Sequence, residues 1–263
     1  MKSNHNVDYP SRCESFENWF QTPLGRSLLA DQRYYLDRRL VKLTGARQLQ
    51  VGVSHRIPLA NSTDFSEKII TTPRCFSDIP EGVVVCDADE LPFPGDSMDL
   101  VVLHHTADFS PYPHQVLREA ARVLRGDGSI VLIGFNPVSV WGIRRLVSRH
   151  HAGPWGGRFL SRGRMEDWLH LLDFQVETSL TRFYHLPFQR SGRKVSGGFV
   201  QRLSGYGVLP VGAYYCILAK KQVCARIPRR NVWRQSKVMG LSGTGTVGAA
   251  RGHPSQSLAP SDE

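Results

Sequence analysis

Three short apolar runs lie in the middle of this 263-residue chain, separated by loops and by one amphipathic segment. They occupy residues 83–86, 100–104 and 129–135. Strands that are apolar at nearly every position are usually buried on both faces, so the pattern predicts a parallel sheet covered by helices. The segment 111–124 places its apolar residues on one face and its charged residues on the other, which predicts a helix. We expect Gly126 and Gly128 to end this helix before the third run begins.

Further elements are predicted on both sides of this series. Residues 17–44 hold two segments with helical spacing, and a second strand is expected at residues 68–72. Ser161 offers an N-cap for a helix over residues 164–172. The last two strands, at 174–183 and 213–220, should form a hairpin-like edge. Residues 73–82 are too few for a crossover helix, so we expect a turn there.

The run CDADELPFPGDSMDLVV, followed by LREAARVLRGDGSIVL, resembles the core of the class I S-adenosylmethionine-dependent methyltransferases, in the branch that acts mostly on small molecules. The resemblance extends over residues 16–220 and is most specific at residues 86–134. It implies an α/β fold with a Rossmann-like, doubly wound, mostly parallel sheet and an antiparallel last strand. It also implies S-adenosylmethionine as the cofactor. In that family an acidic residue after the third strand binds the adenine amino group and the next backbone amide supports the ring, which here are Asp87 and Ala88.

The glycine-rich loop of the family is only partly present. In the family the first strand ends in an acidic residue and spaced glycines, because only glycine lets the backbone approach the cofactor closely. Here Gly52 is retained, Gln50 replaces the acid, and Ser54 and Arg56 replace the later glycines. The second acidic contact, to the ribose hydroxyls, is also missing, because the second strand ends in threonines. Two functions therefore stay open: a methyltransferase, or a catalytically inactive scaffold or regulatory binding protein that has kept the fold.

Ligands of open parallel sheets lie beyond the carboxyl ends of the strands, and this rule selects the candidate site residues. His105 is the candidate catalytic base, needed only if the acceptor must lose a proton. The plainer alternative is that the two histidines are strand-end residues and that Asp87 caps its loop. The candidate cofactor contacts are Gly52, Val53, Ser54, Asp87, Ala88 and His104.

Two other enzyme classes fit the sequence less well than a methyltransferase does. A dinucleotide-binding dehydrogenase would need an intact glycine-rich loop and a further parallel strand. A hydrolase would need a nucleophile elbow, and residues 52–56 begin like one. Arg56 replaces the small residue that closes such a strained turn, which disfavours a hydrolase.

Composition is typical of one α/β unit with a sizeable core, since 41% of the residues are hydrophobic and no run of about 20 apolar residues is present. The first 15 residues lack the apolar core of a signal peptide. The five cysteines are widely spaced, which favours reduced thiols over disulfides or a metal site. We therefore expect a cytoplasmic protein with an N-terminal extension (1–15), a methyltransferase-like domain (16–221) and a disordered basic tail (222–263).

The formal net charge of +10 is concentrated in two regions. Residues 136–202 hold eleven basic and four acidic residues, and residues 220–263 hold eight basic and two acidic residues. Two cap insertions are expected, at 136–160 and 186–212, and the first region contains the former and most of the latter. A basic cap suits a small-molecule or anionic substrate, with Arg144 and Arg145 as candidate contacts. Cap and tail would also suit weak contact with nucleic acid or an anionic membrane, and the plainer alternative is a solvated basic surface.

Overall fold

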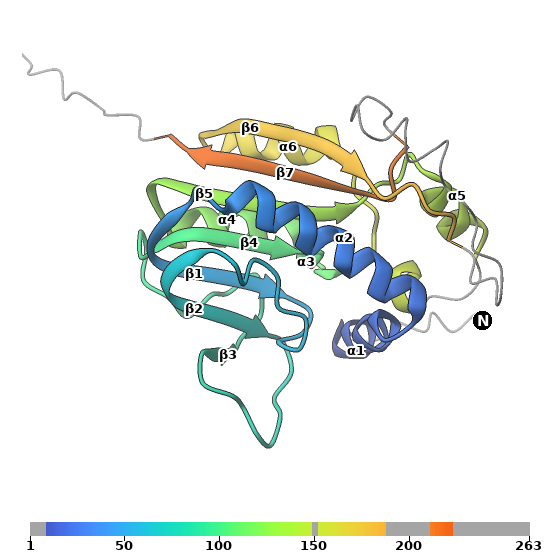
Figure 1. Cartoon of the computed structure of the whole chain (residues 1–263), viewed down its shortest axis with the longest axis horizontal. Coiled ribbons are helices and arrows are strands. Elements are labelled where there is room, and N and C mark those ends of the chain that lie inside the picture. The colour runs from blue at the N-terminus through green and yellow to red at the C-terminus, as the bar shows by residue number, and fades with distance from the viewer. Residues whose placement is uncertain (1–8, 149–151, 188–210, 223–263) are drawn as a thin grey trace, which may run out of the picture. The chain divides into compact units, whose positions relative to one another are not determined.

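A computed structural model describes residues 9–148, 152–187 and 211–222 (Figure 1). The described residues fall within one compact unit, Met1–Cys224. The expected tail and most of the second cap insertion lie outside the described residues. No helix in the described ranges is long and apolar enough to cross a membrane.

The core of the molecule is one seven-stranded sheet with the order β3-β2-β1-β4-β5-β7-β6. Strands β1 to β5 run parallel, whereas β7 is antiparallel to both β5 and β6. This arrangement confirms the predicted mostly parallel sheet with an antiparallel last strand. The strands are β1 (Thr44–Gly52), β2 (Asp64–Thr72), β3 (Val83–Val85), β4 (Met98–His104), β5 (Leu124–Phe135), β6 (Phe174–Arg182) and β7 (Tyr214–Lys221).

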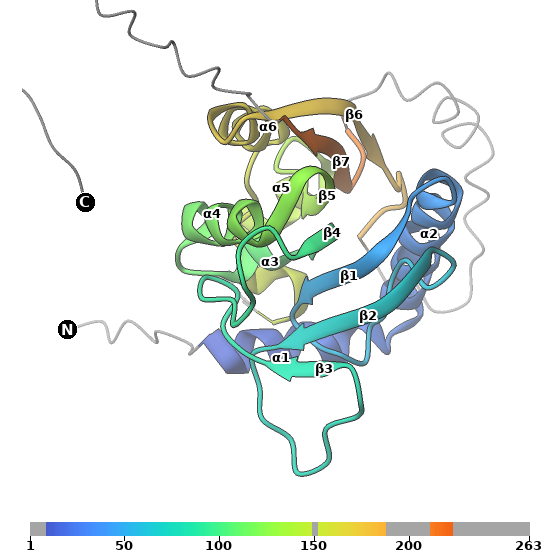
Figure 2. The same ribbon diagram turned by 90° about the vertical axis from the view of Figure 1, so that its left-hand side faces the viewer.

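Helices cover both faces of this sheet (Figures 1 and 2). Helix α2 lies on one face, whereas α4 and α6 lie on the other, and a separate cluster of buried apolar side chains fills each interface. Every residue of β4 is buried, as expected for a strand covered on both sides. The helices are α1 (Tyr9–Phe20), α2 (Pro23–Leu40), α3 (Thr106–Phe109), α4 (Pro113–Val123), α5 (Val140–Val147) and α6 (Arg162–Leu171), with a 3₁₀ turn, η1, at Gly153–Gly156.

One local signal placed a helix start correctly, and another misplaced a helix end. Ser161 is the N-cap of α6, and its hydroxyl accepts a hydrogen bond from the Arg164 amide. Helix α4 ends at Val123, before the two glycines that were expected to stop it. Gly126 and Gly128 instead lie inside β5, which begins at Leu124. Pairing of Leu124 with Met98 of β4 extends this strand back to the end of the helix, so the sheet decides the boundary.

The described structure differs from the sequence interpretation at one further place. Helix α1 begins at Tyr9, inside the stretch expected to be an extension, and Cys13 is fully buried in the core. Residues 53–63 connect β1 to β2 without a helix, and residues 73–82 connect β2 to β3 in the same way. The second of these loops confirms the predicted short connection. Loops, rather than helix starts, therefore follow the carboxyl ends of β1 and β2.

Candidate active site

The carboxyl ends of the parallel strands form one rim of the sheet, and in Figure 1 the arrowheads of β1, β2 and β4 point toward α1. Gly52 and His104 are register partners at the ends of β1 and β4. Val85 pairs with Thr72 at the ends of β3 and β2, and the Cys86 amide donates to the Thr72 carbonyl over 3.1 Å. The topology therefore brings four predicted segments to one edge.

Asp87 follows β3 directly and is exposed on this rim. Among the residues that the structure describes, none forms a side-chain hydrogen bond or an ion pair with the Asp87 carboxylate. Ala88 beside it is buried in the core. An exposed carboxylate next to an anchored backbone is the arrangement needed to accept a hydrogen bond from an amino group.

Two buried polar atoms near the rim lack hydrogen-bond partners. They are the Thr72 hydroxyl oxygen at the end of β2 and Nδ1 of His55 in the loop after β1. Leaving a buried polar group unsatisfied costs about 1–3 kcal/mol, so such atoms are uncommon in native proteins. Both atoms come from segments that border the ribose position of a nucleoside cofactor in this fold. They fit a ligand with hydroxyl groups.

Gln50 stands where the sequence comparison led us to expect an acidic residue, and its side chain has a structural role. Its side chain is almost fully buried. Its Nε2 donates to the Ile57 carbonyl, and its Oε1 accepts from the Leu59 amide, both over 2.8 Å. The amide group thus holds the loop after β1 against the strand. A carboxylate could accept from Leu59 but could not donate to Ile57.

The loop directly after Gly52 turns its side chains inward. Val53 and Ser54 are both 1% exposed, and the Ser54 hydroxyl accepts from the Arg56 amide. Gly52 is also buried, and a Cβ at this position would make only ordinary contacts, with Gln50 Nε2 and His104 Cβ at 3.8 Å. The side chains of Val53 and Ser54 point into the protein, so contact between these residues and a ligand would have to use their backbone groups.

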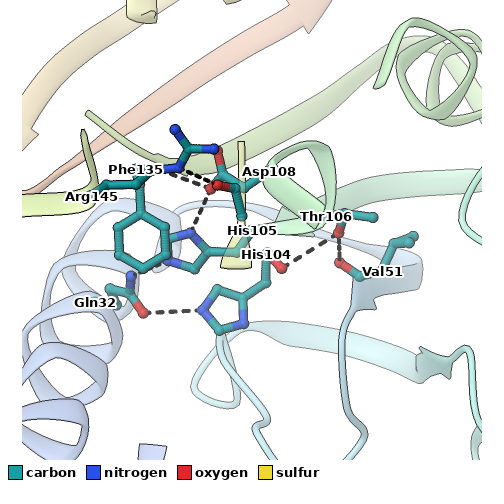
Figure 3. Close-up of polar contacts among 9 residues, drawn as sticks. Gln32, Val51, His104, His105, Thr106, Asp108, Phe135 and Arg145 are labelled. Atoms are coloured by element: carbon teal, nitrogen blue, oxygen red, sulfur yellow. Dashed lines mark hydrogen bonds and ion pairs between the residues drawn. The ribbon is translucent and has the colours of Figure 1, made fainter. Parts of the chain in front are cut away.

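His104 and His105 are joined by one buried glutamine (Figure 3). Gln32, from α2, has its Oε1 3.1 Å from Nε2 of His104 and its Nε2 2.9 Å from Nε2 of His105. Nδ1 of His105 lies 2.9 Å from Oδ2 of Asp108, which also accepts from the Phe135 amide. His105 adopts a left-handed backbone conformation with φ of 55°, and these contacts hold it there.

Burial controls the protonation of this group. It lowers the pKa of His105 to about 3 and lowers the pKa of His104 well below its usual value, with neighbouring His105 and Arg33 adding to the effect on His104. Burial also raises the pKa of Asp108 well above its usual value. Both imidazoles are neutral at physiological pH. In the drawn orientation of Gln32, Nε2 of His105 accepts a hydrogen bond and its Nδ1–H points at Asp108.

The buried His104 predicts a pH-dependent stability. In the unfolded chain this imidazole takes up a proton below about pH 6.5, whereas in the folded chain it stays neutral. The stabilising contribution is therefore present above pH 6.5 and is lost as the pH falls, by up to about 1.4 kcal/mol per pH unit. Denaturant unfolding at a series of pH values should show a shallower pH dependence for His104→Gln. Identical slopes for wild type and variant would contradict this assignment.

Helix α1 lies across the rim and binds segments on both of its sides. Glu17 forms an ion pair with Arg56 at 3.4 Å, and Glu14 forms one with Arg74 at 3.5 Å. On the other side the Gly153 amide donates to the Ser15 hydroxyl over 2.8 Å.

The inner face of α1 fills the space above β4 and β5 with aromatic rings. Phe16 stacks on Phe109 at 4.5 Å between ring centroids and contacts the edge of His105. Phe20 contacts His104, and Phe135 stacks on His105. These rings seal the two histidines from solvent, so α1 closes the region where an acceptor would reach the end of β4.

Arg144 and Arg145 project from α5 onto aromatic rings. The Arg144 guanidinium lies 4.7 Å from the Trp155 ring centroid, and that of Arg145 lies 5.6 Å from the Phe159 centroid. Nε of Arg145 also donates to the Gly157 carbonyl. Burial lowers the pKa of Arg145, and the negative charge of Asp108 opposes this shift. Arg145 thus lies close enough to Asp108 for the two charges to interact (Figure 3).

Sequence and structure comparisons agree with this geometry. A family model described as "Methyltransferase domain" matches residues 54–132. An uncharacterized Escherichia coli protein, YafS, is 37% identical over 156 residues, which are 59% of this chain and 60% of that protein. The chain thus spans about three fifths of the length of the curated relative that it matches.

Solved methyltransferase structures share the fold. A methyltransferase of Thermotoga maritima, described as a possible histamine N-methyltransferase, matches with a TM-score of 0.55 and 21% identity over 81% of this chain and 98% of its own. A methyltransferase of Archaeoglobus fulgidus matches with a TM-score of 0.54 and 19% identity over 78% and 98%. Residues 54–132 thus match a methyltransferase domain, and the described chain shares its fold with solved S-adenosylmethionine-dependent methyltransferases. The match to a methyltransferase domain supports S-adenosylmethionine as the cofactor.

The described site combines predicted and unpredicted residues. Gly52, Asp87 and His104 reach the rim as the sequence indicated, although His104 is buried beneath α1. Sequence reasoning missed Gln32 and Asp108, whose contacts come from chain segments 73 and three residues away from His105. Asp108 carries a local signal, since it lies one helical turn after His105, but only burial makes it distinctive. No cluster of His, Cys, Asp or Glu suited to a metal ion occurs within the described ranges.

Proposed function

We propose that this protein is an S-adenosylmethionine-dependent methyltransferase that acts on a small, anionic acceptor. The observation that carries the proposal is the rim at β2 and β3. There the exposed Asp87 carboxylate and the unsatisfied Thr72 hydroxyl follow neighbouring strand ends of a methyltransferase sheet. Asp87 is exposed, and the Thr72 hydroxyl, although buried, has no hydrogen-bond partner among the described residues.

The residues of the rim fit the parts of the cofactor in turn. Asp87 would accept from the adenine amino group, and the Ala88 amide would support the ring. The Thr72 hydroxyl and Nδ1 of His55 would bond the ribose hydroxyls, and the backbone at Gly52 would face the methionine part. When bound, the cofactor supplies an electrophilic methyl group on a sulfonium.

On the acceptor side, His105 is the proposed base. Once the site opens, its Nε2 would take the acceptor proton, and an ionised Asp108 at Nδ1 would stabilise the imidazolium. In the closed site burial holds the pKa of His105 at about 3 and raises the pKa of Asp108, so the pair takes up these roles only when opening relieves the burial. This role requires Gln32 to leave Nε2, since that nitrogen is now occupied. The positive charge of Arg145 near Asp108, with Arg144 beside it on α5, favours an anionic acceptor.

The same geometry requires α1 to move before an acceptor enters. Phe16 and Phe20 occupy the space above the two histidines. The contacts that hold α1 to the loops include two ion pairs with exposed partners, which contribute little to stability. We therefore propose that α1 is the lid of the acceptor site.

The proposal is tested with methyl-labelled S-adenosylmethionine and the small-molecule fraction of a cell extract. We expect label in anionic metabolites after incubation with the full chain. His105→Gln should lower this transfer about 100-fold or more while leaving cofactor affinity within about twofold, because a general base acts on the chemical step. Circular dichroism would check that the variant is folded. Failure of calorimetry to detect either S-adenosylmethionine or S-adenosylhomocysteine at millimolar concentration would overturn the proposal in favour of an inactive scaffold.

A further inference from the structure

A second hollow lies between α4 and α6, apart from the residues assigned to the cofactor and acceptor. It is an open groove of about 580 Å³. None of Gly52, Thr72, Asp87 or His104 lines it. Its volume falls within the range typical of small-molecule sites. The side chains that matter for its chemistry are Arg118, Arg158, Arg164, Tyr112, Trp168 and Asp89.

Three arginines from three segments make this groove positive. Arg118 comes from α4, Arg164 from α6, and Arg158 from the loop before α6. Arg158 is fixed, because its Nη2 donates to the carbonyls of Ser110 and Pro111, both over 2.7 Å. The side chains of Arg118 and Arg164 make no hydrogen bond or ion pair with any described residue.

Acidic residues do not balance these charges. Asp89 is the only acid that lines the groove. The sequence between Asp127 and Glu166 contains no acidic residue at all. The first turns of α4 and α6, which also border the groove, contain none either. Helix starts attract anions, so their field adds to that of the arginines.

Aromatic side chains provide flat surfaces beside the charges. The Trp168 ring is packed by His114, with 3.5 Å between ring centroids, and remains partly exposed. Tyr112 is 65% exposed at the start of α4. Exposed aromatic rings beside arginines are the combination with which proteins bind phosphate and stack a base.

We propose that this groove binds a nucleotide unit, with the phosphate on Arg118, Arg158 and Arg164 and the base against Trp168 or Tyr112. The unit can be a free nucleotide or part of a single strand, because the recognised chemistry is the same. The inference does not depend on methyl transfer. Binding here should be independent of the cofactor, since the groove and the rim share no assigned residue.

The test uses the full chain, uridine monophosphate and a short uridine oligonucleotide, with S-adenosylhomocysteine present to occupy the rim. Uridine lacks the adenine amino group that Asp87 is expected to bind. The double variant Arg118→Glu with Arg164→Glu should weaken binding of the uridine probes about tenfold or more at low salt. The charge-matched control, Arg38→Glu with Lys42→Glu at the end of α2, should change it less than about threefold.

A further variant separates base stacking from charge. Trp168→Leu should weaken the binding of uridine monophosphate but leave the binding of inorganic phosphate unchanged. A tighter, salt-dependent complex with the oligonucleotide would identify a single strand as the ligand, and equal affinities would identify the free nucleotide. Equal losses of affinity for the uridine probes in the groove variant and in the α2 control would overturn the proposal. The proposal would also be overturned if the protein preferred anionic phosphatidylglycerol vesicles and the groove variant lost vesicle binding but kept its binding of the uridine probes.

Discussion

Replacing Gln50 with glutamate is expected to lower the free energy of unfolding by about 3 kcal/mol at pH 7, although this change moves the sequence toward the family pattern. The carboxylate would lose the bond to the Ile57 carbonyl and face that oxygen without a proton. The site is almost fully buried, so the charge would also be poorly solvated. Denaturant unfolding measures the difference from wild type.

The pH dependence of that difference makes the test specific. Burial and the facing carbonyl should raise the folded pKa of the introduced glutamate above its ordinary value of about 4.3. A protonated carboxyl can donate to Ile57 while it accepts from Leu59. The deficit relative to wild type should therefore be largest above the raised pKa and should shrink as the pH falls.

Gln50→Met is the matched control for this prediction. Its side chain has a similar length but carries neither the donor nor the charge. Its deficit should not vary with pH. If the glutamate variant shows the same constant deficit, the loss comes from packing and the assigned role of the Gln50 amide is wrong.

Asp87→Ala is expected to remove most of the stabilisation that the cofactor product gives to the protein. A ligand that binds only the folded state at one hundred times its Kd stabilises it by about 2.7 kcal/mol. S-adenosylhomocysteine should produce this effect with wild type and little of it with the variant. The unliganded variant should unfold within about 0.5 kcal/mol of wild type, because Asp87 is exposed.

Glu90→Ala controls for loss of charge in the same exposed loop. It should keep the full stabilisation by S-adenosylhomocysteine in a thermal-shift titration. A wild-type shift that Asp87→Ala leaves intact would show that adenine is recognised elsewhere. That outcome would leave the family assignment in place and would remove Asp87 from the site.

The order of strands and helices could be predicted from the sequence. Continuous apolar runs at β4 and β5 require burial on both faces, and the periodicity of α4 supplies one cover. Asp87 was identified through the resemblance, and its position after an apolar run predicted that it lies on the rim. Strand β3 is a partly exposed edge strand rather than the strand buried on both faces that this run indicated. These signals are local, and the sheet did not need to be known.

The histidine network could not be predicted, because its physical meaning depends on contacts between distant segments. Gln32 is an ordinary polar residue of α2 until the fold places its amide between two histidines.

The sequence shows only that Gln50 stands where an acidic residue was expected. Its side chain supports a loop because the fold brings Ile57 and Leu59 back onto it. The sequence by itself thus determined the sheet, its covering helices and the position of the rim, since these follow from hydrophobic periodicity. The tertiary structure decided which polar groups face a ligand and which are used internally, because a buried polar side chain takes its role from the partner that satisfies its hydrogen bonds.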